Sequence, residues 1–367
     1  MGFALALGCA GCGETQQADP FHVVREPNPV AGAGGQTTAG WAGSPYGGGG
    51  GSASPMPMPI DNPLTQIVKS TGCGTEFAGM SGAHVTIPTR GVKDANCADH
   101  LDGVAVCGAW SVPRDYYVNL PAQYDPNKAY PLIFEAPGCG GNGTNIYPLP
   151  NIANQAIRIG LTPGPNSLGH GTNENQRCFD DKEGDDSVDW VFYENMYDKL
   201  NSELCFDRNR VFVSGNSNGA WLANELGCKY AGDALRPVRA VMPRAGGLPT
   251  EPAFVPTCST APVAGLWVQE VPGQTVPFSS GLVAIERAMA LAQCANGHEF
   301  QTARLENFPI GGNNPDNVCQ RIADCDPLYP LVVCPVPTVT QTANDSIVNP
   351  GWSTFVKLFE TSPLLAE

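Results

Sequence analysis

The stretch "RVFVSGNSNGAWLANELG", Arg210–Gly227, holds a serine with a glycine two residues away on either side. Five strand-like residues precede Gly215, and a helical pattern begins at Asn218. A serine on a tight turn between a strand and a helix projects its hydroxyl above a sheet, where it can act as a nucleophile. Glycines fit beside it because a Cβ would clash where the turn brings backbone segments together. The stretch therefore predicts that Ser217 is the nucleophile of a hydrolase.

A second glycine-rich segment supports this prediction. The stretch "FEAPGCGGNGT", residues 134–144, begins at the end of an apolar run that is typical of a buried strand. In α/β-hydrolases the loop after such a strand supplies one backbone N–H to the oxyanion, and the residue after the nucleophile supplies the other. We therefore expect the backbone N–H groups of Cys139 and Asn218 to be the oxyanion donors. A glycine-rich loop without a task is the alternative.

Strand and helix patterns alternate through the rest of the chain. This alternation predicts a mostly parallel sheet with helices on both faces, and with the serine turn it predicts an α/β-hydrolase domain over residues 63–367. We expect strands over 114–121, 130–138, 156–163, 210–215, 238–247, 263–271 and 329–336, the second of them central in the sheet. We expect helices over 218–231, 280–294 and 352–360, and one capped by Asp186 or Ser187 with Val188, Val191, Phe192, Met196 and Leu200 at helical spacing.

The composition limits which kinds of partner the protein can bind. The chain has 367 residues, 42% of them hydrophobic, which is enough for a sizeable core. Acidic residues outnumber basic ones by 35 to 20, and the formal net charge is -15. Because nucleic-acid binding needs a basic footprint, we expect no nucleic-acid partner.

Cysteine usage indicates the compartment. Of 14 cysteines, 12 follow the N-terminal segment, and they are dispersed rather than grouped at zinc-type spacing. An even, dispersed set predicts disulfides, an oxidising compartment and no metal site. A mixture of buried free thiols is the alternative.

The N-terminal residues agree with export. Residues 1–15 contain "MGFALALGCAGCGE", which resembles the end of a bacterial lipoprotein signal with lipidation at Cys9 or Cys12, although no basic residue precedes the apolar run. That run is too short to span a bilayer. Residues 16–62 are rich in Gly, Pro and Ser, a composition that predicts a flexible linker.

Two long segments resemble a known family. They are "YYVNLPAQYDPNKAYPLIFEAPGCGG", residues 116–141, and "CFDDKEGDDSVDWVFYENMYDKLNSELCFDRNRVFVSGNSNGA", residues 178–220. Over about residues 71–359 the chain resembles the secreted feruloyl esterases and polyhydroxybutyrate depolymerases, which are carbohydrate esterases of the α/β-hydrolase fold. The resemblance implies a Ser-Asp-His triad without a metal or organic cofactor. It also implies a polysaccharide-ester or polyester substrate, and disulfides Cys178–Cys205 and Cys228–Cys258.

The sequence departs from the family at the other two triad positions. The acid should follow the strand over 263–271, where Gly273 occupies the aspartate position and Glu270 is the only local substitute. The base should follow the strand over 329–336, where Gln341 occupies the histidine position. Glutamine cannot take the serine proton, so loss of the base predicts a large loss in rate.

The chain offers few replacement bases. It has five histidines, which are His22, His84, His100, His170 and His298. His170 follows the strand over 156–163, and loops at that end of the sheet lie over the active site, so it is the candidate substitute base; a loop or core histidine is the alternative. His298 follows a helix and should lie at the far end of the sheet.

Three interpretations therefore stand. The protein is an esterase with a rewired base, a degenerate hydrolase that binds a polysaccharide or an ester, or an envelope protein that keeps the fold without using the pocket. Ester turnover that depends on Ser217 separates the first from the others.

Overall fold

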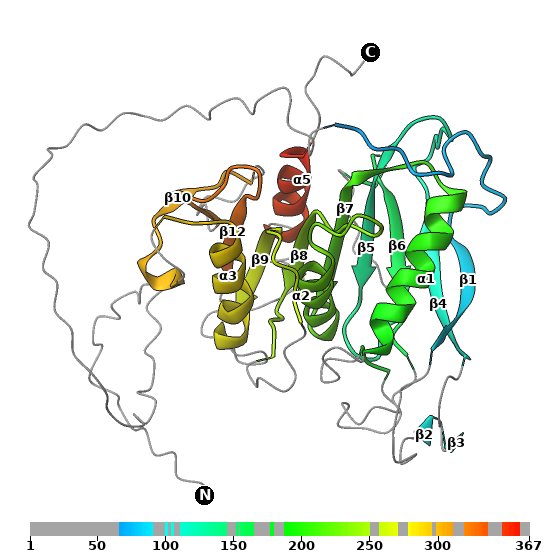
Figure 1. Cartoon of the computed structure of the whole chain (residues 1–367), viewed down its shortest axis with the longest axis horizontal. Coiled ribbons are helices and arrows are strands. Elements are labelled where there is room, and N and C mark those ends of the chain that lie inside the picture. Colours follow the sequence, from blue (N-terminus) through cyan, green and yellow to red (C-terminus); the bar gives the residue numbers. More distant parts are fainter. Residues whose placement is uncertain are drawn as a thin grey trace, which may run out of the picture. The chain divides into compact units, whose positions relative to one another are not determined.

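A computed structural model gives the fold (Figure 1). It describes residues 66–90, 100–101, 104–105, 111–144, 152–153, 155–164, 177–179, 187–249, 257–270, 278–295, 299–310, 319–336 and 347–359. These residues all belong to one compact unit, Gly47–Glu367. The predicted export segment and linker, residues 1–62, lie outside the described residues.

A ten-stranded sheet forms the centre of this unit, in the order β1-β4-β6-β5-β7-β8-β9-β12-β11-β10. The six strands from β6 to β12 are parallel, and β4 is antiparallel to both of its neighbours. This is the sheet of an α/β-hydrolase, and the predicted fold class is confirmed. The strands are β1 (Ala83–Arg90), β4 (Ser111–Asn119), β5 (Tyr130–Ala136), β6 (Ile157–Leu161), β7 (Phe206–Asn216), β8 (Ala240–Arg244), β9 (Ala264–Glu270), β10 (Leu305–Asn307), β11 (Gln320–Ile322) and β12 (Leu331–Val336). A separate small sheet pairs β2 (His100–Leu101) with β3 (Val104–Ala105).

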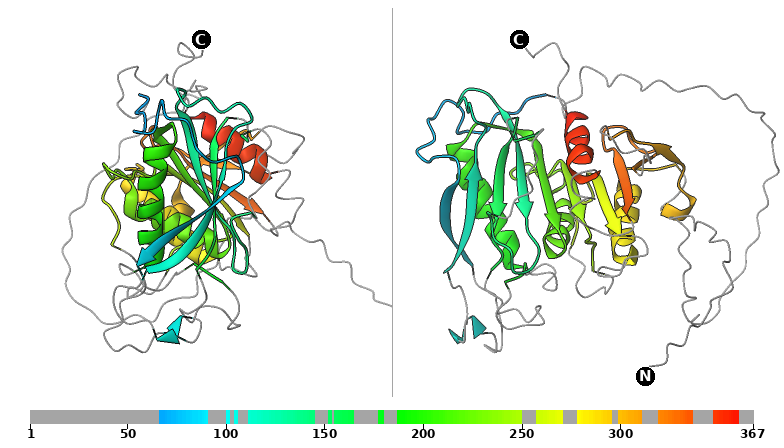
Figure 2. Two further views of the ribbon diagram at one scale, coloured as in Figure 1. Left: turned by 90° about the vertical axis from the view of Figure 1, so that its right-hand side faces the viewer. Right: turned by 180° about the vertical axis from the view of Figure 1, so that it is seen from behind.

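Helices cover both faces of the large sheet, as predicted. The helices α1 (Val188–Glu203), α2 (Asn218–Tyr230) and α3 (Phe278–Leu291) lie on one face, and α5 (Asn349–Lys357) lies on the other (Figure 2). The strand β5 is buried along almost all of its length and lies between β6 and β7, so the expected central position is confirmed. No helix within the described ranges is long and apolar enough to cross a membrane.

The helix α1 begins where its cap residue predicts, and Phe192, Met196 and Leu200 of its expected apolar face are buried. The Ser187 side chain accepts a hydrogen bond from the N–H of Asp189 and so caps the helix, rather than Asp186. Val188 and Val191 are only half-buried. The aromatic side chains of Trp190, Tyr193 and Tyr197 are buried instead, because these larger rings bury more apolar surface against the sheet.

A buried ion pair attaches α1 to the sheet. Arg114 on β4 and Asp189 on α1 are 3% and 1% exposed, and Nη2 of Arg114 lies 2.5 Å from Oδ1 of Asp189. The Arg114 guanidinium also lies over the ring of Phe192, 4.5 Å from its centroid. The same helix carries a second pair, Lys199–Glu203, which is more than one-third exposed.

We expect Arg114→Met to lower the free energy of unfolding by about 3–5 kcal/mol, because it deprives a buried carboxylate of its guanidinium. The matched variant Lys199→Met breaks the exposed pair on the same helix and should cost less than about 1 kcal/mol. Urea denaturation with an unchanged m-value measures both. Equal losses in the two variants would show that burial does not set the strength of the Arg114 pair.

Ten of the twelve cysteines after the N-terminal segment form five disulfides: Cys73–Cys205, Cys139–Cys178, Cys228–Cys258, Cys294–Cys325 and Cys319–Cys334. The other two, Cys97 and Cys107, lie outside the described residues. The predicted pairing of cysteines is confirmed for these ten, and so is the specific pair Cys228–Cys258. Such a set is typical of proteins that fold in an oxidising compartment.

The expected disulfide Cys178–Cys205 is wrong. Cys205 precedes the first residue of β7, whereas residue 179 bonds to Asn218 beyond the other end of that strand. The 11 residues of β7 span roughly 35 Å at about 3.3 Å per residue, too far for a disulfide. The chain before β1 runs beside the start of β7, where the N–H of Ser70 bonds to the carbonyl of Phe206, and this brings Cys73 to Cys205.

Candidate active site

Ser217 lies on the turn between β7 and α2, and the strand–turn–helix prediction is confirmed. Its φ of 52° falls in the left-handed region that residues with a side chain rarely adopt. A Cβ on Gly215 would meet the backbone of Gly219, and a Cβ on Gly219 would meet the carbonyl oxygens of Ala136 and Pro137. Close backbone approach on both sides thus holds the serine in a strained conformation, with its side chain half-buried.

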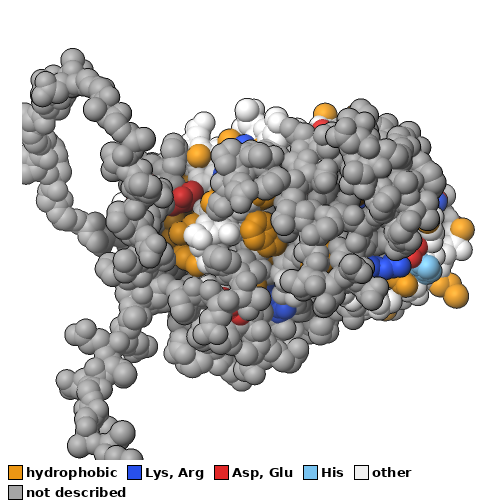
Figure 3. All heavy atoms as spheres, turned by 90° about the horizontal axis from the view of Figure 1, so that it is seen from below, with side chains coloured by type: hydrophobic (Ala, Val, Ile, Leu, Met, Phe, Trp, Pro, Cys, Tyr) orange, Lys and Arg blue, Asp and Glu red, His pale blue; other side chains and the backbone are white. Residues whose placement is uncertain are grey.

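The turn lies at the carboxyl edge of the parallel strands, which point downward in Figure 1. Figure 3 looks onto this edge from below, where hydrophobic side chains of described residues are visible between grey atoms. Substrate sites of open α/β sheets lie at this edge because the loops that follow the strands gather there. Ser217 is therefore placed where the chemistry of such a fold takes place.

The loop after β5, residues 137–144, packs directly against the serine. A Cβ on Gly138 would lie 3.3 Å from the Cβ of Ser217. The N–H of Gly141 donates to the carbonyl of Gly138 at 3.0 Å, and Gly140 has a φ of 78°, so the loop turns tightly beside the nucleophile position. Within the described part of the chain, the backbone N–H groups of Cys139 and Asn218 make no hydrogen bond. Both predicted oxyanion donors therefore lie next to Ser217 with their N–H groups available.

A short segment that the sequence analysis did not single out contacts both donors. Residues Arg177–Phe179, which we call the strap, lie beside this loop and beside the start of α2. Cys178 forms a disulfide with Cys139. The N–H of Phe179 donates to Oδ1 of Asn218 at 2.6 Å, and Nδ2 of Asn218 donates to the Phe179 carbonyl at 3.1 Å. The strap thus touches both residues whose N–H groups are the candidate oxyanion donors.

A buried arginine is the second feature that sequence reasoning missed. Arg244 ends β8, and its carbonyl accepts the N–H of Ser217 at 2.9 Å. Its Nε and Nη2 both donate to Oδ1 of Asn216, at 2.8 and 2.6 Å. The turn therefore has a guanidinium packed against the residue that precedes the serine.

The strands that should present the acid and the base end side by side. In the ladder, Glu270 at the end of β9 pairs with Val336 at the end of β12. Gln269 is buried, and its Nε2 donates to the carbonyl of Gly246 at 2.6 Å. A Cβ on Gly281 of α3 would meet the Gln269 side chain, so Gln269 faces α3. Glu270, as the next residue of the strand, is directed to the opposite face.

The remaining candidates are placed only in part. Gly273, Gln341 and His170 lie outside the described residues, so their predicted roles stay predictions; His22 and His298 lie outside them too. His84 lies on the edge strand β1, four strands from β7, or about 19 Å at about 4.8 Å per strand. Its Nε2 lies 3.1 Å from Oδ1 of Asp115, and its ring stacks on Tyr117. No group of three or more His, Cys, Asp or Glu in the described ranges could hold a metal ion.

The chain was compared with protein families, with curated proteins and with solved structures. No protein-family model matches the chain. It is 27% identical over 209 residues to the probable feruloyl esterase C of Aspergillus niger, which covers 54% of this chain and 67% of that protein. It is 26% identical over 178 residues to the feruloyl esterase C of Emericella nidulans, which covers 46% of this chain and 58% of that protein. The chain is thus similar in sequence to feruloyl esterases over about half of its length.

Among solved structures, the acetyl xylan esterase from Aspergillus awamori aligns with this chain at a TM-score of 0.46. The two are 13% identical in sequence, and the alignment covers 72% of this chain and 98% of that one.

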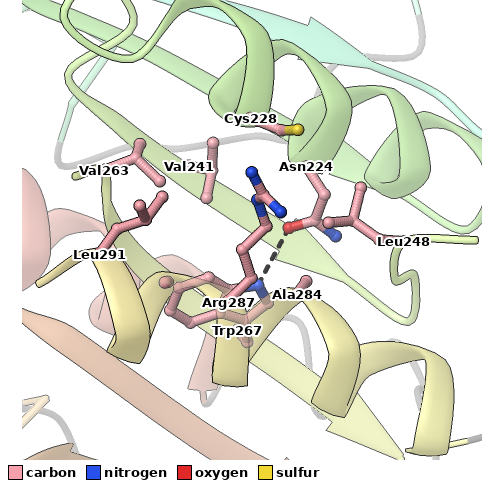
Figure 4. Close-up of a pocket in the computed structure, with 10 residues that line it drawn as sticks. Asn224, Cys228, Val241, Leu248, Val263, Trp267, Ala284, Arg287 and Leu291 are labelled. Carbon is pink, nitrogen blue, oxygen red and sulfur yellow. Dashed lines mark hydrogen bonds between the residues drawn. The ribbon is translucent and has the colours of Figure 1, made fainter. Parts of the chain in front are cut away.

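One pocket of the protein lies away from Ser217, between α2 and α3 (Figure 4). Its lining is mostly aliphatic. Nε1 of Trp267 donates to Oδ1 of Asn224 across it at 3.0 Å, and Nδ2 of Asn224 donates to the Gly247 carbonyl. Burial lowers the pKa of the Arg287 guanidinium, which also lines it. Ser217 is not among the lining residues, so this pocket is not the candidate site. It lies where α2 and α3 pack against the sheet.

Proposed function

We propose that the protein is an exported serine carboxylic-ester hydrolase with Ser217 as its nucleophile. The observation that carries the proposal is the conformation of Ser217, held at a φ of 52° on a strand-to-helix turn with the glycine-rich loop against it. Homology to feruloyl esterases supports ester chemistry. The substrates that fit are feruloyl or acetyl esters of plant polysaccharide, or a short-chain hydroxyalkanoate polyester.

In this proposal the Ser217 hydroxyl attacks the ester carbonyl and a tetrahedral oxyanion forms. The N–H groups of Cys139 and Asn218 bind that oxyanion; a single donor of this kind contributes about 10²–10³ in rate. Collapse of the intermediate releases the alcohol and leaves an acyl group on Ser217. Water then attacks the acyl-enzyme and releases the acid. The organic and metal chemistry of a cofactor is not needed for any of these steps.

The proton of the Ser217 hydroxyl needs an acceptor, and here the sequence lacks the residues that the family resemblance leads us to expect. With Gly273 and Gln341 in the expected acid and base positions, no side chain of the usual triad takes the proton of the Ser217 hydroxyl, and hydrolysis is slow. His170 as substitute base, with Glu270 as substitute acid, is the rewired form of the same proposal. The two forms differ in rate, because general-base catalysis contributes about 10²–10⁴.

The disulfides support the proposed location. Five of them among the described residues favour export to an oxidising compartment. A lipid on Cys9 or Cys12 would hold the protein at the cell envelope. A flexible linker over residues 16–62 would then let the hydrolase domain reach a polymeric substrate.

A second candidate function is favoured by one specific observation, the occupation of both triad positions by Gly273 and Gln341. A hydrolase fold that has lost its acid and base can still bind its ligand. In that case the protein is an envelope protein that binds a polysaccharide or an ester.

A substrate panel tests the proposed class. Methyl ferulate, acetylated xylan and a soluble hydroxybutyrate oligomer are incubated with the protein, beside an amide and a phosphoester of similar size. We expect turnover of at least one ester and of neither control substrate. Cleavage of the amide or the phosphoester alone would overturn the assignment, and ester binding in calorimetry without any turnover would establish the binding protein instead.

A further inference from the structure

Each of the three residues of the strap, Arg177–Phe179, contacts one of the two elements that carry the candidate oxyanion donors. The carbonyl of Arg177 accepts the N–H of Gly140 at 2.6 Å. Cys178 is covalently bound to Cys139. Phe179 exchanges two hydrogen bonds with the side chain of Asn218. Every residue of the strap is therefore tied either to the loop after β5 or to the first residue of α2.

The contact with Asn218 depends on the chemistry of a carboxamide. Its Oδ1 accepts the N–H of Phe179, while its Nδ2 donates to the carbonyl of the same residue. Aspartate keeps the acceptor and loses the donor, and alanine loses both. Asn218 and Phe179 are both buried, so an unmade bond here is not replaced easily by water.

The loop after β5 needs such a support. Three of its first five residues are glycines, Gly138, Gly140 and Gly141, and Gly140 has a φ of 78°. Glycine backbone has many accessible conformations, so the sequence of the loop does not by itself fix where the N–H of Cys139 points. The disulfide to Cys178 removes much of that freedom.

We propose that the strap sets the distance and direction between the two oxyanion donors, the N–H groups of Cys139 and Asn218. In this assignment, which rests on the proposed ester hydrolysis, the Asn218 side chain, Cys178 and Phe179 are positioning groups that act through those N–H groups. The geometry matters because donors stabilise the transition state only when they lie within about 2.7–3.1 Å of the oxyanion. A displacement of about 1 Å in a reacting group can cost about 10²-fold in rate.

The kinetic test uses variants that leave both backbone N–H groups in place. We expect Asn218→Asp, Asn218→Ala and the pair Cys139→Ser/Cys178→Ser each to lower kcat for methyl ferulate about tenfold to a hundredfold, with KM changed less than about twofold. The matched control is Cys228→Ser/Cys258→Ser. This variant removes a disulfide from the same helix, at a residue ten positions beyond Asn218, which is about 15 Å along α2 at about 1.5 Å per residue. It should keep kcat within about twofold.

A combined variant separates positioning from general loss of structure. Because the disulfide and the carboxamide act through one strap, Asn218→Ala added to Cys139→Ser/Cys178→Ser should cost much less than the product of the two separate losses. Fully multiplicative losses would overturn the proposal. So would a rise in KM at constant kcat, or an equal fall of kcat in the Cys228→Ser/Cys258→Ser control.

Hydrogen exchange followed by mass spectrometry gives a readout that does not need turnover. Exchange in the peptide over residues 137–144 should be at least about tenfold faster in Asn218→Ala and in Cys139→Ser/Cys178→Ser than in the unmodified protein, while the peptide over α5 stays unchanged. If the protein hydrolyses no ester, the proposed function fails and this measurement still decides whether the strap holds the loop. Unchanged exchange in both variants would refute the strap even in an active esterase.

Discussion

Replacing Ser217 by alanine should lower the hydrolysis of methyl ferulate toward the rate in buffer, leaving only what the oxyanion donors and substrate binding still contribute. The hydroxyl is the only part of the proposed nucleophile that the substitution removes. In an enzyme with a complete triad, loss of the serine lowers kcat about 10⁶-fold. The loss should be smaller here, because the unmodified protein is itself expected to be slow. Steady-state rates of Ser217→Ala and of the unmodified protein, measured against a buffer blank, give the result.

The control for this variant is Ser202→Ala on the exposed side of α1, where the hydroxyl donates only to the carbonyl of Lys199. It should leave the rate unchanged. Ser217→Ala that keeps the full rate of the unmodified protein would show that the turn between β7 and α2 does not carry the nucleophile. The proposed mechanism would then be wrong whatever the substrate.

Restoring both absent triad groups should raise the rate of a protein whose triad has decayed. We expect Gly273→Asp combined with Gln341→His to increase kcat/KM for methyl ferulate by about 10²-fold or more, because a positioned general base contributes about 10²–10⁴. Each change alone should give little, since the aspartate and the histidine act as a unit. The gain must disappear when Ser217→Ala is added, which is the control in the same background.

The opposite outcome identifies the rewired form. If the unmodified protein turns over esters with a kcat in the ordinary range of about 1–10³ s⁻¹, and His170→Ala abolishes that turnover, then His170 is the base. In that case Gly273→Asp with Gln341→His should bring no gain, because the serine already has a proton acceptor. The two forms therefore predict opposite responses to the same pair of variants.

The features that could be predicted from the sequence are those with a local signal. The glycine spacing around Ser217 follows from the close approach of Gly215 and Gly219 to neighbouring backbone, and the structure shows both approaches. The mostly apolar run of β5 also predicted a central strand, because a strand covered on both faces has few polar residues. The Ser187 cap of α1 was also readable, because it is a contact between residues two apart.

The features that could not be predicted are contacts between distant segments. The short strands β10 and β11, of three residues each, carry no periodic pattern that a sequence can reveal. Disulfide connectivity is of the same kind: Cys73 reaches Cys205 across 132 residues, so the expected Cys178–Cys205 pair failed. The contacts of Phe179 with Asn218 and of Arg244 with Asn216 span 39 and 28 residues. They make up much of the candidate site, and only the fold brings them together.

Trapping the acyl group on the protein tests the central claim most directly. With 4-nitrophenyl acetate the leaving group departs without help from an acid, whereas release of the acyl group needs activated water, so a site without its usual base should accumulate the acyl-enzyme. After an acid quench and digestion, mass spectrometry should find acetyl on the peptide that contains Ser217, and Ser217→Ala should not carry it. Turnover of the ester with acetyl on another residue, or no acetylation of Ser217 under conditions in which the ester is consumed, would contradict the account.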